Sequence, residues 1–221
     1  MKKKPLIYMA GNELVKKILG GERDFSGIQL ENGFDLNASG VFEQIQAYLD
    51  KESERLVPYI DNKCFTRECS ALADNEFKFF LSDMTGFKAE GLVLPFIDAS
   101  YARFCNAKLS RANFHHGEFD QANFTGADLS DASLSWSDLQ DAIFNRASMS
   151  GADISYSKIG GAKFRRTKMG ERLPDIHGAY YPSYECQDNR LWLTGDATAY
   201  RWFKVGNDWH IDFEVKGCIP R

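Results

Sequence analysis

The sequence predicts a mainly β fold, a parallel β-helix built from five-residue units, on three observations. From Tyr101 to Gly170 the chain divides into fourteen consecutive five-residue units without an insertion. Each unit has Phe, Leu, Met or Ile at its fourth position, and most have Ala at the second. Residues twenty apart are alike, and one such series is unbroken: Phe104, Phe124, Phe144 and Phe164.

A period of five matches neither the 3.6-residue helix nor an alternating strand. It fits a coil in which each unit forms one side, the large fourth residue fills the interior and the small second residue avoids crowding it. Likeness at twenty residues then indicates four sides per coil, with coils stacked at strand spacing, about 4.8 Å. Residues 84–171 would make about four to five coils, because the phase continues upstream in weaker form at Phe87, Leu92 and Ile97.

Units such as GADLS and QANFT follow the pattern A-(D/N)-(L/F)-x-x and resemble the pentapeptide-repeat family. The resemblance implies a right-handed quadrilateral β-helix. Some members of this family are DNA mimics that act on type II topoisomerases. The resemblance therefore adds DNA gyrase or a topoisomerase to the possible partners.

Residues 1–83 are expected to form an N-terminal unit that begins with a helix. Residues 12–19 have their apolar side chains on one helical face, and Gly20-Gly21 follows. The segment RDFSGIQL then keeps the repeat phase as far as Leu30. We expect the phase to fail there, because Phe34-x-Leu36 comes one residue late.

A helical insertion is expected next, with amphipathic helices over residues 41–56 and 71–81 separated by Pro58. The ends of a β-helix expose apolar core and unpaired backbone groups, which promote aggregation unless they are covered. We therefore expect the insertion to pack on the side or the N-terminal end of the coil.

Residues 172–221 form a third, aromatic-rich segment. Trp209, Ile211, Phe213 and Val215 alternate with polar residues, as in a half-buried strand. A turn at residues 206–208 and a strand over residues 198–205 precede them. The segment is expected to be a small antiparallel β cap on the C-terminal end of the coil.

The bulk composition favours a cytoplasmic, bacterial protein. A net charge of −4 argues against direct nucleic-acid binding. The apolar run after Lys4 is short and is followed by Asn12-Glu13, which does not fit a secretory signal, and no run is long enough for a membrane helix. Five scattered cysteines fit reduced thiols.

Catalytic signals are absent from the sequence. The four His have no metal-ligand spacing, and there is no Gly-rich phosphate loop. We therefore expect no enzyme activity, no metal and no cofactor. A weaker alternative is a small-ligand or enzymatic site in the aromatic C-terminal segment.

The twenty-residue register indicates a candidate interaction surface. The first residues of every fourth unit are aromatic and would stack as an outward stripe: Phe96, His116, Trp136 and Tyr156. Acidic residues would lie beside it: Glu118, Asp120, Asp138 and Asp141. Large aromatic side chains that point away from a core are usually covered. The stripe is therefore either covered by the insertion or the C-terminal segment, or it binds a partner.

Charge is also uneven along the coil. An acidic body is followed by a basic end patch: Lys158, Lys163, Arg165, Arg166 and Lys168. Both are either solvated surface or interaction sites. The expected function is a protein–protein interaction scaffold or regulatory module with an unidentified protein partner. The alternative is a DNA-mimic modulator of a type II topoisomerase, although four to five coils span only about 20–25 Å.

Overall fold

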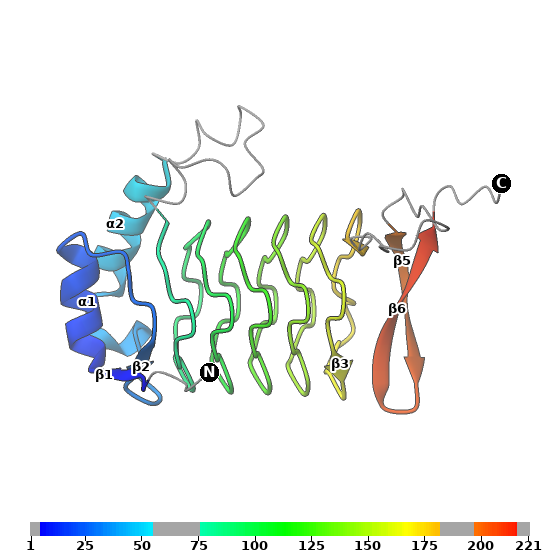
Figure 1. Cartoon of the computed structure of the whole chain (residues 1–221), viewed down its shortest axis with the longest axis horizontal. Helices are drawn as coiled ribbons and strands as arrows, with labels where there is room; N and C mark the ends of the chain where they lie inside the picture. The colour runs from blue at the N-terminus through cyan, green and yellow to red at the C-terminus, as the bar shows by residue number, and fades with distance from the viewer. Residues whose placement is uncertain (1–4, 55–75, 182–196, 216–221) are drawn as a thin grey trace.

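The computed structural model describes residues 5–54, 76–181 and 197–215. A stack of coils forms the middle of the molecule (Figure 1). Helices α1 (Gly11–Leu19) and α2 (Phe42–Glu54) lie at the N-terminal end of the stack. Strands β5 (Ala197–Val205) and β6 (Asp208–Val215) form a hairpin at the other end. No helix in these ranges is long and apolar enough to cross a membrane.

Each coil pairs with the next through parallel backbone bridges between residues twenty apart. We number the four faces by the outward residues that these bridges join. Face 1 is Lys78, Asp98, Glu118, Asp138 and Lys158; face 2 is Asp83, Arg103, Asn123, Ile143 and Lys163; face 3 is Lys88, Lys108, Asp128, Ser148 and Lys168; face 4 is Val93, Asn113, Ser133 and Asp153.

The interior is filled by the second and fourth residues of the units. Phe104 and Phe124 stack with ring centroids 5.2 Å apart, and Phe144 continues the stack at 5.3 Å. The small second residues are fully buried between such columns; Ala102, for example, is 0 % exposed. Burial of these apolar columns is the main source of stability that the repeat provides.

The coil begins earlier in the chain than expected. Asp24, Gln29 and Asp35 bridge to Lys78, Asp83 and Lys88, so residues 24–36 form three sides of a first coil. The one-residue shift expected after Leu30 is present, since Asp35 follows Gln29 by six residues, but it does not end the coil. The extra residue is absorbed at the corner that contains Gly33, where φ is +72°, and Leu36 is buried again. Strand β1 (Ile7–Met9) pairs in parallel with β2 (Ile28–Leu30) at the edge of this coil.

The helix expected over residues 71–81 is wrong for residues 76–81, and residues 71–75 lie outside the described ranges. Phe77 and Phe79 are buried in the coil, one turn below Ile97 and Ala99. Phe77, Phe80 and Leu81 would share a helical face, but Phe80 and Leu81 are exposed, and the inward pair Phe77 and Phe79 has the two-residue spacing of the repeat. A boundary between residues 83 and 84 would therefore fall inside a coil.

The helices and two side-chain amides cover the N-terminal end. Leu14 and Val15 of α1 and Ile45 and Leu49 of α2 are buried against the first coil. The described residues supply three sides of that coil, and at the fourth side Gln46 of α2 bonds to Val93. Its amide accepts from the Val93 N–H at 2.9 Å and donates to the Val93 carbonyl at 3.2 Å.

The C-terminal hairpin pairs with the last coils. Strand β6 is antiparallel to β3 (Phe164–Arg165), and β5 pairs with β4 (Tyr180–Tyr181). The Trp202 ring meets the Phe164 ring edge-on at 4.9 Å and so ends the Phe column. The Trp202 indole N–H donates to the Pro174 carbonyl at 2.9 Å. The coil itself extends beyond residue 171, since Asp153 bridges to Asp175.

Candidate interaction surface

The four aromatic residues of the predicted stripe occupy one corner of the coil, which we call the aromatic corner: Phe96, His116, Trp136 and Tyr156. Their φ angles are between +56° and +59°. This left-handed region favours Gly and, next, Asn and Asp. Each of the other three corners of these coils includes Gly together with Asn or Asp, for example Gly126 with Asn106. The aromatic corner has none of these residues from 96 to 156.

The aromatic rings stack along the coil axis. Phe96 lies over His116 with centroids 5.4 Å apart, His116 is parallel to Trp136 at 5.8 Å, and Trp136 is parallel to Tyr156 at 4.5 Å. His177 meets Tyr156 edge-on at 5.4 Å. The ring faces are therefore turned toward one another, and the ring edges point outward.

Exposure changes along this stack. Phe96 is 7 % exposed, whereas Trp136 is 47 % and Tyr156 is 40 % exposed. The stripe is thus covered at its N-terminal end and open to solvent over the coils of Trp136 and Tyr156. Burial lowers the pKa of His116 to about 4, with a further contribution from His115, so the His116 imidazole is neutral near pH 7.

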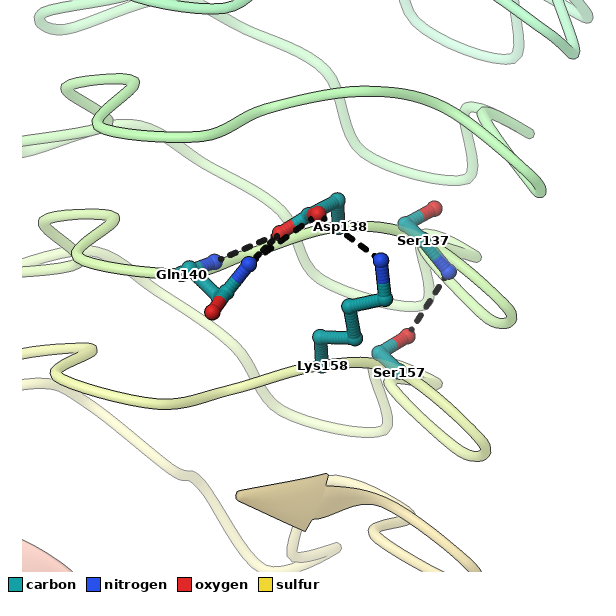
Figure 2. A network of polar contacts seen from close by, with 5 residues as sticks. All are labelled: Ser137, Asp138, Gln140, Ser157 and Lys158. Carbon is teal, nitrogen blue, oxygen red and sulfur yellow. Dashed lines mark hydrogen bonds and ion pairs between the residues drawn. The ribbon is translucent and has the colours of Figure 1, made fainter. Parts of the chain in front are cut away.

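A buried hydroxyl ladder lies directly behind the aromatic corner. Ser137 Oγ accepts from the Gly117 N–H at 3.0 Å. Ser157 Oγ likewise accepts from the Ser137 N–H at 3.0 Å, as Figure 2 shows. Ser157 Oγ in turn donates to the Leu134 carbonyl at 2.8 Å. These bonds hold the backbone that follows His116 and Trp136. The sequence indicated the small size of this column but not its hydrogen bonds.

Face 1 places carboxylates beside the aromatic corner. Asp98, Glu118 and Asp138 follow one another along it, and Lys78 and Lys158 stand at its ends. Asp138 accepts from the Gln140 backbone N–H at 3.2 Å and pairs with Lys158 at 3.2 Å (Figure 2).

Carboxylate crowding shifts two pKa values on this side of the coil. The pKa of Asp120 is raised by burial first and then by Asp138 and Asp141. The pKa of Glu76 is raised to about 7 by burial, then by Glu118 and Asp98. Glu76 precedes Phe96 by twenty residues and so starts the aromatic corner; the sequence pattern gave no signal for it.

The basic end patch is not one patch in the structure. Lys158 lies on face 1, Lys163 on face 2 and Lys168 on face 3, so these bases surround one coil. Arg165 and Arg166 lie at the corner between faces 2 and 3. The Arg165 Nε is 3.5 Å from Oδ2 of Asp208 in β6. Only the four bases from Lys163 to Lys168 share a corner.

The described residues contain no cluster of three or more His, Cys, Asp or Glu side chains that could hold a metal. The alternative site in the C-terminal segment depends on aromatic residues such as Tyr184 and Trp192, which lie outside the described ranges.

A parallel coil of five-residue sides with an unbroken interior column defines a β-helical solenoid. The family of pentapeptide repeats matches residues 96–126 and 127–166 with eight copies, so this segment of the chain is similar to the pentapeptide repeats. No curated protein sequence matches the chain.

Three solved structures illustrate the similarity. HetL, involved in heterocyst differentiation regulation in the cyanobacterium Nostoc sp. strain PCC 7120, is 23 % identical with a TM-score of 0.36 over 42 % of this chain and 40 % of that chain. A pentapeptide repeat protein from the Arabidopsis thaliana thylakoid lumen is 26 % identical with a TM-score of 0.31, and the match covers 48 % of this chain and 70 % of that chain. QnrB1, a plasmid-mediated fluoroquinolone resistance protein, is 18 % identical with a TM-score of 0.21, and the match covers 49 % of this chain and 81 % of that chain. The match thus spans less than half of HetL.

Proposed function

We propose that this protein is a non-enzymatic interaction module, a scaffold or regulatory protein, that binds a protein partner through the aromatic corner and face 1. One observation carries the proposal: Trp136 and Tyr156 are exposed at corner positions that favour Gly or Asn. A left-handed φ costs about 1 kcal/mol for such residues, and stacking contributes about 0.5–1.5 kcal/mol.

Stacking thus offsets the backbone strain but gives no reason for ring edges to remain in solvent. Aromatic side chains that stand exposed on a rigid, well-packed surface are typical of interface hot spots. The hydroxyl ladder behind the corner fixes the backbone there, so a partner would meet a preorganised surface.

Affinity capture with the purified protein tests the proposal. Trp136→Asn removes the ring and keeps a residue that suits a left-handed φ. Arg146→Asn is the matched control, because Arg146 is exposed at another corner with the same φ of +59°. We expect a protein that the wild type and Arg146→Asn retain and Trp136→Asn loses, with all three proteins giving cooperative thermal unfolding. Equal capture by Trp136→Asn would contradict the proposal.

A second candidate function, modulation of a type II topoisomerase by DNA mimicry, is favoured by the row of carboxylates on face 1. The row comprises Asp98, Glu118 and Asp138 between Lys78 and Lys158, a length of about 10 Å at strand spacing. A gyrase supercoiling assay tests it with wild type and the triple variant Asp98→Asn, Glu118→Gln, Asp138→Asn. Inhibition by the wild type alone would support mimicry, and no effect of either protein would exclude it.

A further inference from the structure

We propose that the partner segment seated on the aromatic corner and face 1 is a basic amphipathic α-helix that lies along the coil axis. The inference rests on the proposed function and adds the chemistry and shape of the partner. Charge, ring orientation and repeat spacing each contribute one step.

The charge of the surface selects a basic partner. Among the described residues of this surface, the carboxylates Glu76, Asp98, Glu118 and Asp138 outnumber the bases Lys78 and Lys158. Asp120 and Asp141 add negative charge close to Asp138. Burial and the nearby carboxylates raise the pKa values of Glu76 and Asp120. Lys or Arg side chains from a partner would relieve the repulsion between these carboxylates, and opposite charges would also steer its approach.

The orientation of the rings requires an apolar strip beside those charges. Cations bind best over the face of an aromatic ring, but the faces of Trp136 and Tyr156 are stacked on each other at 4.5 Å. Their edges are what a partner meets, and aliphatic or aromatic side chains pack against edges. A partner element with basic and apolar strips side by side is amphipathic.

The spacing of the coils selects a helix over a strand. Successive residues of face 1 are one coil apart, about 4.8 Å. One helical turn advances about 5.4 Å, whereas same-face residues of a strand are about 6.7 Å apart. From Asp98 to Asp138, two coil spacings make about 10 Å, compared with about 11 Å for two helical turns and about 13 Å for two strand repeats. Basic residues at i, i+4 and i+7 of a helix can therefore each face one carboxylate.

Fluorescence anisotropy with labelled fourteen-residue peptides and the full-length protein tests the inference. The first peptide has Lys at i, i+4, i+7 and i+11 with Leu in the adjacent strip. The second has the same composition in scrambled order, and the third has Pro in place of a central residue. At physiological ionic strength we expect the first peptide to bind at least tenfold more tightly than the other two.

Matched variants place the binding on face 1. Asp98→Asn together with Asp138→Asn removes two charges but keeps the turn hydrogen bond, since Asn113 and Asn123 accept the same backbone bond at equivalent positions. Asp128→Asn with Asp153→Asn is the control on faces 3 and 4, where both carboxylates make the same bond. We expect roughly tenfold weaker peptide binding for the first pair and no change for the second.

Equal affinity for all three peptides would overturn the inference, because it would show that the protein binds them by nonspecific electrostatic attraction and does not require a helix. Failure of every peptide to bind, while Trp136→Asn still abolishes capture of the natural partner, would also overturn it but leave the proposed function intact. If Trp136→Asn left that capture unchanged, the proposed function itself would fail.

Discussion

His116 shows how the aromatic corner constrains a single residue. Its ring lies between Phe96 and Trp136, and burial lowers its pKa to about 4. An unfolded chain protonates His near pH 6.5. Between about pH 6.5 and pH 4 the unfolded state therefore binds a proton that the folded state does not. Stability from this group is complete above pH 6.5 and is lost progressively as the pH falls toward 4.

Replacement of His116 by Phe should remove this contribution to the pH dependence. Phe already occupies the same corner at Phe96, so the coil can hold the larger ring. We expect the wild type to lose more stability than the variant between pH 6.5 and pH 4, while the two differ little above pH 7. Urea denaturation at a series of pH values measures the difference. Parallel stability curves for the two proteins would contradict the assignment of a neutral, buried imidazole.

At the scale of elements, helix α2 completes the coil by a side chain and not by backbone. Gln46 satisfies both the N–H and the carbonyl of Val93, where a fourth strand would have paired. Asn37 does the same for Glu90, with bonds of 2.8 and 2.9 Å. The first coil thus ends without open backbone groups at these positions, which limits edge-to-edge association.

Gln46→Ala should lower the free energy of unfolding by about 1–2 kcal/mol, because two backbone groups lose their partners. Gln44→Ala is a matched control on the same helix, since Gln44 is exposed, and we expect a change below about 0.5 kcal/mol. Chemical denaturation gives both values, and hydrogen exchange at the Val93 amide should be faster only in Gln46→Ala. A similar loss in both variants would contradict the role of the Gln46 amide, because Ala has a higher helix propensity than Gln and neither variant should lose stability through propensity.

Helices α1 and α2 follow from apolar periodicity, which is a local property of the chain. The role of Gln46 could not be predicted, because Val93 is 47 residues away and the pairing depends on how α2 docks. The helix expected over residues 71–81 was wrong at Phe77 and Phe79 for the opposite reason. Phe77 with Phe80 and Leu81 suits a helical face, whereas Phe77 with Phe79 suits the repeat, and only the ladder to the neighbouring coil distinguishes the two structures.

At the scale of the molecule, the twenty-residue register predicts on which face or corner of the coil each residue of the repeat lies. It placed the four residues of the aromatic corner together and put Asp138 on the neighbouring face. It could not predict that Phe96 is covered while Trp136 is open, because cover depends on packing outside the repeat. The basic end patch, which was defined from the sequence alone, likewise grouped Lys158 with residues that lie on other faces of the coil.

The same register predicts that one whole coil can be removed. Deletion of residues 103–122 would join Ala102 to Asn123. Asn123 is the equivalent of Arg103 one coil later, so it would take the place of Arg103. Phe124 would then stack on Met84 in place of Phe104, so inward and outward residues remain in phase. Stability in a solenoid is approximately a sum over repeats and their interfaces. We therefore expect a cooperatively folded protein with lower stability and a smaller urea m-value, because less surface is exposed on unfolding.

Deletion of residues 105–122 is the control, because its eighteen residues are not a multiple of five. It would place Phe124 at an outward corner two positions after Phe104 and turn polar side chains inward. We expect this protein to unfold at a lower urea concentration than the whole-coil deletion, or to aggregate. Size exclusion and urea denaturation compare the two. Equal stability would contradict the four-sided register, since a coil that tolerates any deletion length would not need its residues twenty apart to match.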